Sequence, residues 1–247
     1  MPTSRQYRSQ MYENYSTVQK PAWNESDAEA DAVWSQAAFI RLRGWLPRDK
    51  RVKCLDLGCG SGLLLETLRG AGYCDVRGVD IGPQGVDISR RKGFRVAEAD
   101  LRDFFRESSE SFDLITAFDV IEHLERDELL DLLPIIYSHL TPGGRFIIQT
   151  PNASSPWAAS SRYGDLTHEW IFTPRSITSV LRLMGFSEVR SKEVTPYVHG
   201  TFSALRWVLW KLIWTGCYLW NLAESGYDCG GIYTRNMMVI AVRPLDR

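Results

Sequence analysis

The chain has 247 residues, of which 44% are hydrophobic and 24% charged, with a formal net charge of −1. This length and this hydrophobic content suffice for one α/β domain with insertions, so no second folded domain is needed. The near-neutral charge balance gives no electrostatic footprint for a nucleic-acid partner. Small molecules, sugars or lipids are therefore the expected partners.

Cysteine usage and the first residues bear on the compartment. The five cysteines, Cys54, Cys59, Cys74, Cys217 and Cys229, form no Cys-x-x-Cys pair. A reducing compartment is the simplest interpretation of this pattern. The first eight residues lack the apolar core of a secretory signal, so export is not expected. Together these observations predict a cytoplasmic protein.

Apolar runs alternate with helical patterns along most of the chain. Such alternation implies an α/β fold with a mostly parallel sheet and helices on both of its faces. The predicted strands are 52–57, 76–80, 94–98, 112–118, 144–150, 186–194 and 232–242. The predicted helices are 62–70, 84–92, 101–107, 125–140 and 174–184. Thr141-Pro142-Gly143-Gly144 predicts a turn before the fifth strand.

The chain divides into an N-terminal region at residues 1–48 and a main domain at 49–247. Within the main domain, insertions at 151–173 and 195–231 fall outside this alternation, as the N-terminal region also does. The N-terminal region carries Tyr7, Tyr12, Tyr15 and Trp23 before an amphipathic run at about 27–46. It predicts a helical lid that closes over the ligands, with packing on the sheet edge as the alternative. The insertions are where the acceptor substrate is expected, because ligands of open α/β sheets sit beyond the carboxyl ends of the strands.

A glycine-rich turn follows the first predicted strand. Gly58, Gly60 and Gly62 let the backbone reverse tightly and approach a ligand that any Cβ would push away. The helix that follows presents backbone amides that can receive a carboxylate or a phosphate. The sequence thus predicts a cofactor site at this turn.

Acidic residues at later strand ends narrow the choice of cofactor. Asp80 ends the second strand, where a carboxylate can accept both ribose hydroxyl protons, as for NAD or any adenosine cofactor. Asp56, inside the first strand, would repel a dianionic pyrophosphate and suits a cationic ligand. Asp100 could accept a hydrogen bond from the adenine amine. This set favours S-adenosylmethionine (SAM) over NAD.

Five ordered motifs together give a family resemblance. They read LDLGCGSG, GVDIG, AEADL, FDLITAFDVIEHL and LTPGGRFIIQTPN. Their order resembles that of class I SAM-dependent methyltransferases. The likeness is greatest to those of bacterial polysaccharide and glycan gene clusters, which also carry segments like YGDLTHEWIFTPRSI.

The resemblance implies a Rossmann-like, doubly wound sheet of about seven strands, with the last strand antiparallel between the fifth and the sixth. It also implies a set of cofactor-binding residues: Asp56, Gly58, Cys59, Gly60, Gly62, Asp80, Ile81, Asp100, Leu101, Phe118 and Asp119. In this set Asp56 and the turn hold the methionyl end, Asp80 the ribose and Asp100 the adenine. Phe118 and Asp119 flank the sulfonium.

Asp119, Glu122 and His123 form the first candidate catalytic cluster, since residues i, i+3 and i+4 of a helical turn share a face. His123 could take the proton from an attacking hydroxyl as a general base. Alternatively, the three groups could bind a divalent cation such as Mg²⁺, as implied by a similar E-x-x-E-H element in ubiquinone-pathway O-methyltransferases. A third interpretation is structural, with Asp119 contacting the cofactor and Glu122 closing a capping pair.

His168, within Tyr163 to Trp170, is the second candidate base, on a loop expected to border the acceptor pocket. The alternative is that its imidazole only satisfies backbone groups where the insertion rejoins the core.

The segment 201–223 is rich in tryptophan, and Arg206 and Lys211 interrupt it. Its uncharged runs are too short for a transmembrane helix, whereas tryptophans with flanking cations suit a helix lying in a membrane interface. Peripheral membrane contact is one expectation. The alternatives are a homodimer interface and a helix packed over the acceptor pocket.

The sequence thus predicts a SAM-dependent methyltransferase, most consistent with O-methylation of a sugar, a glycan precursor or a related small hydroxylated acceptor by direct displacement. The alternatives are N- or C-methylation of another small molecule, a NAD-dependent oxidoreductase, and a non-catalytic SAM-binding or membrane-docking scaffold.

Overall fold

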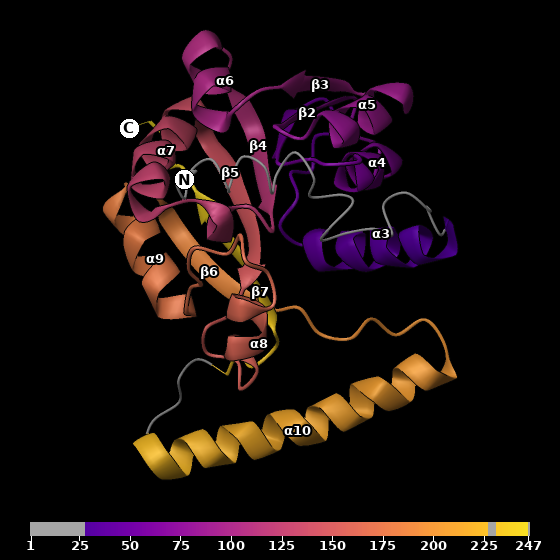
Figure 1. The fold of residues 1–247 in the computed structure, drawn as a ribbon, viewed down its shortest axis with the longest axis vertical. Helices are drawn as coiled ribbons and strands as arrows, with labels where there is room; N and C mark the ends of the chain where they lie inside the picture. The colour runs from indigo at the N-terminus through magenta and orange to yellow at the C-terminus, as the bar shows by residue number, and fades with distance from the viewer. Residues whose placement is uncertain (1–27, 227–230, 247) are drawn as a thin grey trace, which may run out of the picture.

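A seven-stranded sheet forms the centre of the computed structural model, which describes residues 28–226 and 231–246. The strand order is β3-β2-β1-β4-β5-β7-β6 (Figure 1). The strands are β1 (Lys53–Leu57), β2 (Asp75–Asp80), β3 (Arg95–Glu98), β4 (Phe112–Phe118), β5 (Leu140–Pro151), β6 (Ser187–Glu193) and β7 (Asn236–Val242). β7 runs antiparallel to both of its neighbours, and the pairings among β1 to β5 are parallel. The predicted fold class, with the last strand antiparallel between the fifth and sixth, is confirmed.

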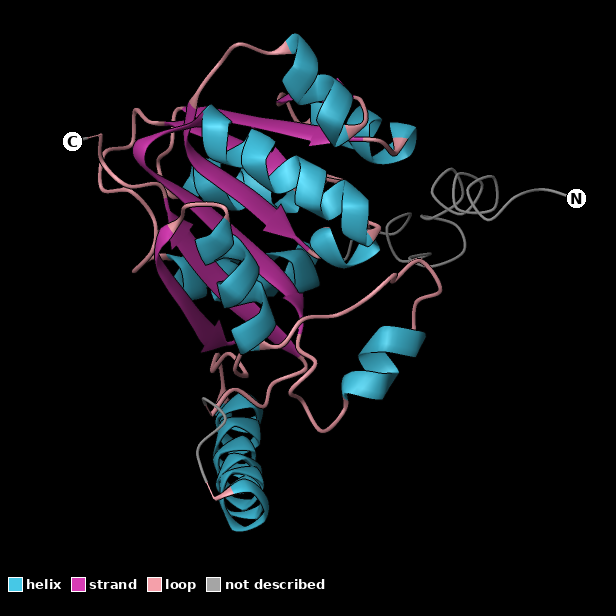
Figure 2. Ribbon diagram, turned by 90° about the vertical axis from the view of Figure 1, so that its left-hand side faces the viewer, coloured by secondary structure: helices cyan, strands magenta, loops and turns pink. Residues whose placement is uncertain are grey.

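Helices cover both faces of the sheet (Figure 2). One layer consists of α3 (Ala28–Leu42), α4 (Leu63–Gly70) and α5 (Pro83–Arg91). The other consists of α6 (Leu101–Glu107), α7 (Arg126–His139) and α9 (Pro174–Leu183). From β1 the strand order proceeds to one edge of the sheet through β2 and β3, and from β4 it proceeds toward the other edge. The carboxyl ends of β1 and β4 are therefore the topological switch point, where α/β proteins bind ligands.

The central strands are buried on both faces, which explains their nearly continuous apolar sequences. In β5, Phe146 and Ile148 join the core beneath α7 and α9, whereas Ile147 joins the core beneath α3 and α4. In β7, Val239 and Ile240 alternate between the same two cores. This period of two fixes which face of the sheet each side chain meets.

Two predicted boundaries differ from the structure. β5 begins at Leu140, and the expected turn at 141–144 lies inside it as an irregularity, because the pairing with β4 shifts there and Gly143 has a φ of 78°. β7 begins at Asn236 instead of 232, because the preceding residues contact the first insertion.

The insertions contain two further helices, α8 (Ala158–Tyr163) and α10 (Thr201–Ser225). Both lie beyond the carboxyl end of β5, with α10 set apart from the sheet (Figure 1). Of the expected N-terminal lid, the structure describes the part that forms α3. The described residues do not include Tyr7, Tyr12, Tyr15 and Trp23, which the prediction also placed in the lid.

Asn152 ties the two insertions together. Its amide Nδ2 donates to the carbonyl oxygens of Ile232 and Thr234, and its Oδ1 accepts from the amide of Ser154. The side chain is fully buried.

We predict that Asn152→Ala lowers the free energy of unfolding by about 1–3 kcal/mol, because buried carbonyls lose their donor. Urea denaturation followed by circular dichroism measures this loss, and a change below about 0.5 kcal/mol would contradict it.

Candidate active site

The glycine-rich turn after β1 has the backbone that the sequence predicts. Gly58, Gly60 and Gly62 have φ values of 65°, 50° and 82°, in the left-handed region that favours glycine. A Cβ at Gly58 would lie 2.5 Å from Cγ2 of Val120, and one at Gly85 would lie 2.9 Å from the carbonyl carbon of Gly60. The turn is therefore packed between the β4 loop and α5, and no larger residue fits these positions without movement.

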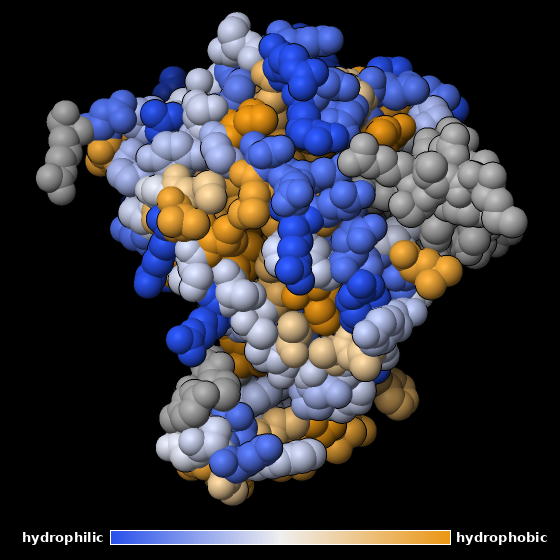
Figure 3. Space-filling model, turned by 60° about the vertical axis from the view of Figure 1, so that its left-hand side comes forward, coloured by the Kyte–Doolittle hydropathy of each residue, from blue (hydrophilic) through white to orange (hydrophobic). Residues whose placement is uncertain are grey.

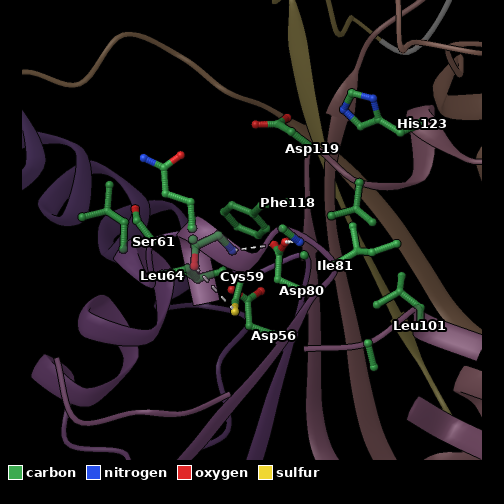
Figure 4. Close-up of a pocket in the computed structure, with 18 of the residues that line it drawn as sticks. Asp56, Cys59, Ser61, Leu64, Asp80, Ile81, Leu101, Phe118, Asp119 and His123 are labelled. Atoms are coloured by element: carbon green, nitrogen blue, oxygen red, sulfur yellow. Dashed lines mark hydrogen bonds between the residues drawn. The ribbon is translucent and has the colours of Figure 1, made fainter. Parts of the chain in front are cut away.

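Asp80 joins the turn to the loop after β2. Its Oδ2 accepts from the amide of Gly60 and its Oδ1 from the amide of Gly82, both at 2.7 Å (Figure 4). Each carboxylate oxygen can accept more than one hydrogen bond, so the group can still receive hydroxyl donors. This geometry agrees with a ribose-binding role.

A cavity of about 480 Å³ opens between these loops. Its walls include every predicted cofactor residue except Gly62, namely Asp56, Gly58, Cys59, Gly60, Asp80, Ile81, Asp100, Leu101, Phe118 and Asp119. Gly62 instead stands at the N-terminus of α4. Trp34 of α3 also lines the cavity, with its ring 6.5 Å from that of Phe118. The sequence signalled α3 only as a helical run, and nothing in it singled out Trp34.

Asp56 is buried at the base of the cavity and accepts a hydrogen bond of 2.6 Å from the hydroxyl of Thr116. Burial raises its pKa to about 7, and the nearby charge of Asp80 adds to this shift. Two carboxylates in one cavity favour a cationic ligand and oppose a pyrophosphate. The cavity therefore fits SAM, whose methionyl ammonium and sulfonium are both positive, better than NAD.

Asp100 and Asp119 both have partners within the protein. Asp100 caps α6 by accepting from the amide of Arg102 at 2.8 Å. The carboxylate of Asp119 accepts from Nε2 of Gln149 at 3.1 Å and from Nδ2 of Asn236 at 3.4 Å. Both still line the cavity.

The expectation that Asp119, Glu122 and His123 share one helical face is wrong. The helical turn η2 covers only Ile121–His123, and Asp119 precedes it with a left-handed φ of 54°. The i, i+3 rule does not extend across such a backbone. Asp119 lines the cavity together with the other residues predicted to bind the cofactor.

The structure instead brings His168 to Glu122 and His123. One potential ligand atom of each residue lies within 4.8 Å of the others, and the two imidazole rings are 4.7 Å apart. Glu122 is fully buried and accepts from the hydroxyl of Thr150 at 3.0 Å. Of the two histidines, His123 lines the cavity and His168 is not among its lining residues.

A chain of hydrogen bonds sets the protonation of His123. Its Nδ1 lies 2.8 Å from Oγ1 of Thr167, and the Thr167 hydroxyl donates to Oδ1 of Asp165 at 2.6 Å. Since that hydroxyl has a single proton, it must accept from Nδ1 of His123, so in the neutral ring the proton sits on Nδ1 and Nε2 is unprotonated. The sequence placed Asp165 and Thr167 in a polar loop but did not indicate this contact.

His168 has the same tautomer for a different reason. Its Nδ1 lies 2.7 Å from the carbonyl oxygen of Ser161, which can only accept a hydrogen bond. The proton therefore sits on Nδ1, and the ring is fastened to the backbone of α8. This contact matches the loop-fastening alternative for His168.

The cluster is a poor match for the Mg²⁺ considered from the sequence. Mg²⁺ takes oxygen ligands, whereas Glu122, His123 and His168 offer two imidazoles and one carboxylate, a set suited to transition-metal ions. Asp119, the other carboxylate expected to take part, is not in the cluster. We therefore assign no reaction step to Mg²⁺.

Residues 28–191 match a family model described as a methyltransferase domain. The chain therefore belongs to this family, and with its fold it is a class I SAM-dependent methyltransferase domain. Its acceptor is a separate question.

The relatives differ in their acceptors. The chain is 29% identical over 156 residues to the mitochondrial ubiquinone biosynthesis O-methyltransferase of Mus musculus, a match that covers 55% of this chain and 41% of that protein. It is 27% identical to the tRNA U34 carboxymethyltransferase of Methylococcus capsulatus, covering 67% of this chain and 54% of that protein. A SAM-dependent methyltransferase from Archaeoglobus fulgidus has a similar structure, with a TM-score of 0.63, 23% identity, and 84% and 94% of the two chains covered. The chain thus spans only part of these curated relatives.

The raised pKa of Asp56 predicts a pH-dependent affinity. Because a cationic ligand prefers the ionised carboxylate, binding of SAM should strengthen roughly tenfold between pH 6 and pH 8 and level off above the pKa of about 7. In the unliganded protein the same group should lower stability as pH rises between about 4 and 7, because only the folded state keeps the proton. Calorimetry across this range measures the affinity. Asp56→Asn should bind weakly with a flat profile, and an equally steep profile in this variant would contradict the assignment.

Proposed function

We propose that the protein transfers the methyl group of SAM to a hydroxyl group of a sugar, a glycan precursor or a related small hydroxylated acceptor. The observation that carries this proposal is that His123 lines the cavity and that its neutral ring carries the proton on Nδ1, which makes Nε2 the basic atom. A hydroxyl is a weak nucleophile and gains from a base at the moment of transfer. The curated relatives named O-methyltransferases support the same chemistry.

The cavity residues divide the cofactor between them. Asp56 and the turn 58–62 would hold the methionyl end, Asp80 with Ile81 the ribose, and Asp100 with Leu101 the adenine. Phe118 and Asp119 would flank the sulfonium. When bound, SAM supplies an electrophilic methyl group. Trp34, on α3, supports the proposal that this helix acts as a lid over the site.

The base step follows from the hydrogen-bond chain. Nε2 of His123 takes the proton of the acceptor hydroxyl. The imidazolium that forms still carries its proton on Nδ1 and donates it in the hydrogen bond to Oγ1 of Thr167. Asp165 lies at the far end of the chain, and its carboxylate favours the positive ring. His168 packs against His123 and orients it. General-base catalysis of this kind contributes on the order of 10²–10⁴-fold.

The first insertion supports a sugar-like acceptor. Tyr163 and Trp157 expose aromatic surface on α8 and at its start, in a loop otherwise rich in polar groups. A sugar ring has apolar faces and polar hydroxyl groups. It could therefore stack on these aromatic side chains and form hydrogen bonds with the polar groups of the loop.

An acceptor screen tests the function. Purified protein and SAM are incubated with panels of nucleotide sugars, free glycans, phenols and amines, and S-adenosylhomocysteine formation is measured. Turnover with hydroxylated sugars and none with amines is the expected result. Turnover confined to amines would overturn O-methylation, and turnover with phenols alone would keep O-methylation but exclude the sugar. Saturable SAM binding with no turnover on any panel would favour the non-catalytic alternative.

Binding and catalysis should separate in two variants. Asp80→Ala should weaken SAM binding at least about tenfold, because it loses the ribose contacts and the amides of Gly60 and Gly82. His123→Ala should bind SAM normally and slow turnover by about 10²–10⁴-fold. Titration calorimetry and initial rates measure the two effects. The exposed Asp87→Ala on α5 serves as a matched control, and equal binding losses in the first two variants would contradict the assigned roles.

Thr167 should act as a positioning residue. Thr167→Val removes the hydroxyl that accepts from His123, so kcat should fall at least about tenfold with KM for SAM unchanged, and the pH profile should shift. Thr167→Ser keeps the hydroxyl and should restore both. A serine variant as slow as the valine variant would indicate a packing role instead.

A further inference from the structure

The helix α10 has a face for which the described protein supplies no cover. Its large exposed hydrophobic residues are Phe202, Leu205, Trp207, Val208, Leu209, Leu212, Ile213, Leu219, Trp220 and Leu222. Ser203 is the only residue of the helix that is buried. Figure 3 shows the helix at the bottom of the molecule, with hydrophobic side chains on its surface.

The opposite face of α10 is attached to the body. The indole nitrogen of Trp214 donates to the carbonyl oxygen of Gly231 at 2.8 Å, and its ring packs edge-on against Tyr233. The ring of Trp210 lies 6.5 Å from that of Trp157, at the start of α8. These contacts fix which face of the helix points away from the protein.

The outward face is wide and free of charge. At about 100° per residue, the exposed hydrophobic residues other than Trp207 fall within an arc of about 180°. The other residues of this arc are small or neutral. Lys211 lies just beyond one edge and Arg206 just beyond the other, with Glu224 on the same edge as Arg206. The arc is thus bordered on both sides by a cation.

From this pattern we propose that α10 lies flat on the surface of a lipid bilayer, with its outward face among the acyl chains and Arg206 and Lys211 at the headgroups. Cations at both borders of an apolar face match anionic headgroups, because long basic side chains extend from the apolar region to the interface. A helix of 25 residues is about 37 Å long, which gives the face a large area of contact.

A second copy of the chain fits this face less well than a bilayer does. The seam between two packed helices is a narrow stripe, so one partner helix would leave the edges of an arc of about 180° in water. A bilayer surface covers the whole arc. None of the helices in the described ranges has the length and apolarity to cross a membrane, so the proposed contact is with the surface.

The placement of α10 gives the contact a direction. Both α10 and α8 lie beyond the carboxyl ends of β4 and β5 (Figure 1), the same side of the sheet on which Asp119 and His123 line the cavity. Docking through α10 would therefore turn the cavity side of the protein toward the bilayer. The contact through α10 does not depend on which acceptor the protein uses.

Vesicle sedimentation tests the proposal with the full chain. Wild-type protein should co-sediment with phosphatidylcholine vesicles containing 30% phosphatidylglycerol, and less with phosphatidylcholine alone. The double variant Leu212→Glu and Leu219→Glu should reduce the bound fraction at least about tenfold, because it places two charges in the apolar arc. Leu183→Glu on α9, 78% exposed, is the matched control and should bind like the wild type.

Two further measurements keep the outcome unambiguous. SAM affinity by calorimetry should be equal in all variants, because α10 does not line the cavity, and this equality shows that the variants fold. Sedimentation velocity without vesicles reports on self-association. Wild-type protein that stays in the supernatant with both vesicle types would overturn the proposal, as would a dimer that the double variant converts to monomer.

Discussion

The site depends on the bridge that Asp80 makes between two loops. With one oxygen on Gly60 and the other on Gly82, its carboxylate holds the glycine turn of β1 against the start of α5. The contact is possible only because the turn is left-handed and lacks side chains at the points of closest approach. Hydrogen bonds to a charged acceptor are stronger than neutral ones, so this bridge resists opening better than packing alone would. These hydrogen bonds hold the two loops that form the floor of the cavity together.

The carboxylates and the imidazole occupy different parts of the cavity. Asp56 and Asp80 lie at the bottom of the cavity, close enough for the charge of Asp80 to raise the pKa of Asp56. The far wall holds an imidazole whose protonation is fixed by a threonine and an aspartate outside the cavity. The two carboxylates and the imidazole thus lie at different parts of the same cavity (Figure 4). In the proposed reaction, the carboxylates would hold the positive cofactor and the imidazole would take the proton of the acceptor hydroxyl.

The sequence predicted the sheet well and the grouping of the candidate catalytic residues only in part. Apolar strands and glycine turns are local signals, so the strand ends bearing Asp56, Asp80 and Asp100 could be located from periodicity. The grouping of His123 with His168 depends on how the first insertion folds back over η2, where the amide of Glu169 donates to the carbonyl of Glu122. That contact spans more than forty residues and leaves no periodic trace. Asp119 departs from the predicted helical face for the opposite reason, because its left-handed backbone breaks a local rule.

The position of β7 has a consequence for how the sheet is assembled. β7 pairs with β5 on one side and β6 on the other, yet it is the last strand of the sheet along the chain. As the polypeptide leaves the ribosome, β5 therefore has an unpaired edge while the whole of α10 is being made. Unpaired strand edges and exposed apolar helices are both prone to association with other chains. Completion of the fold then depends on a late, long-range pairing, and contacts of this kind slow folding.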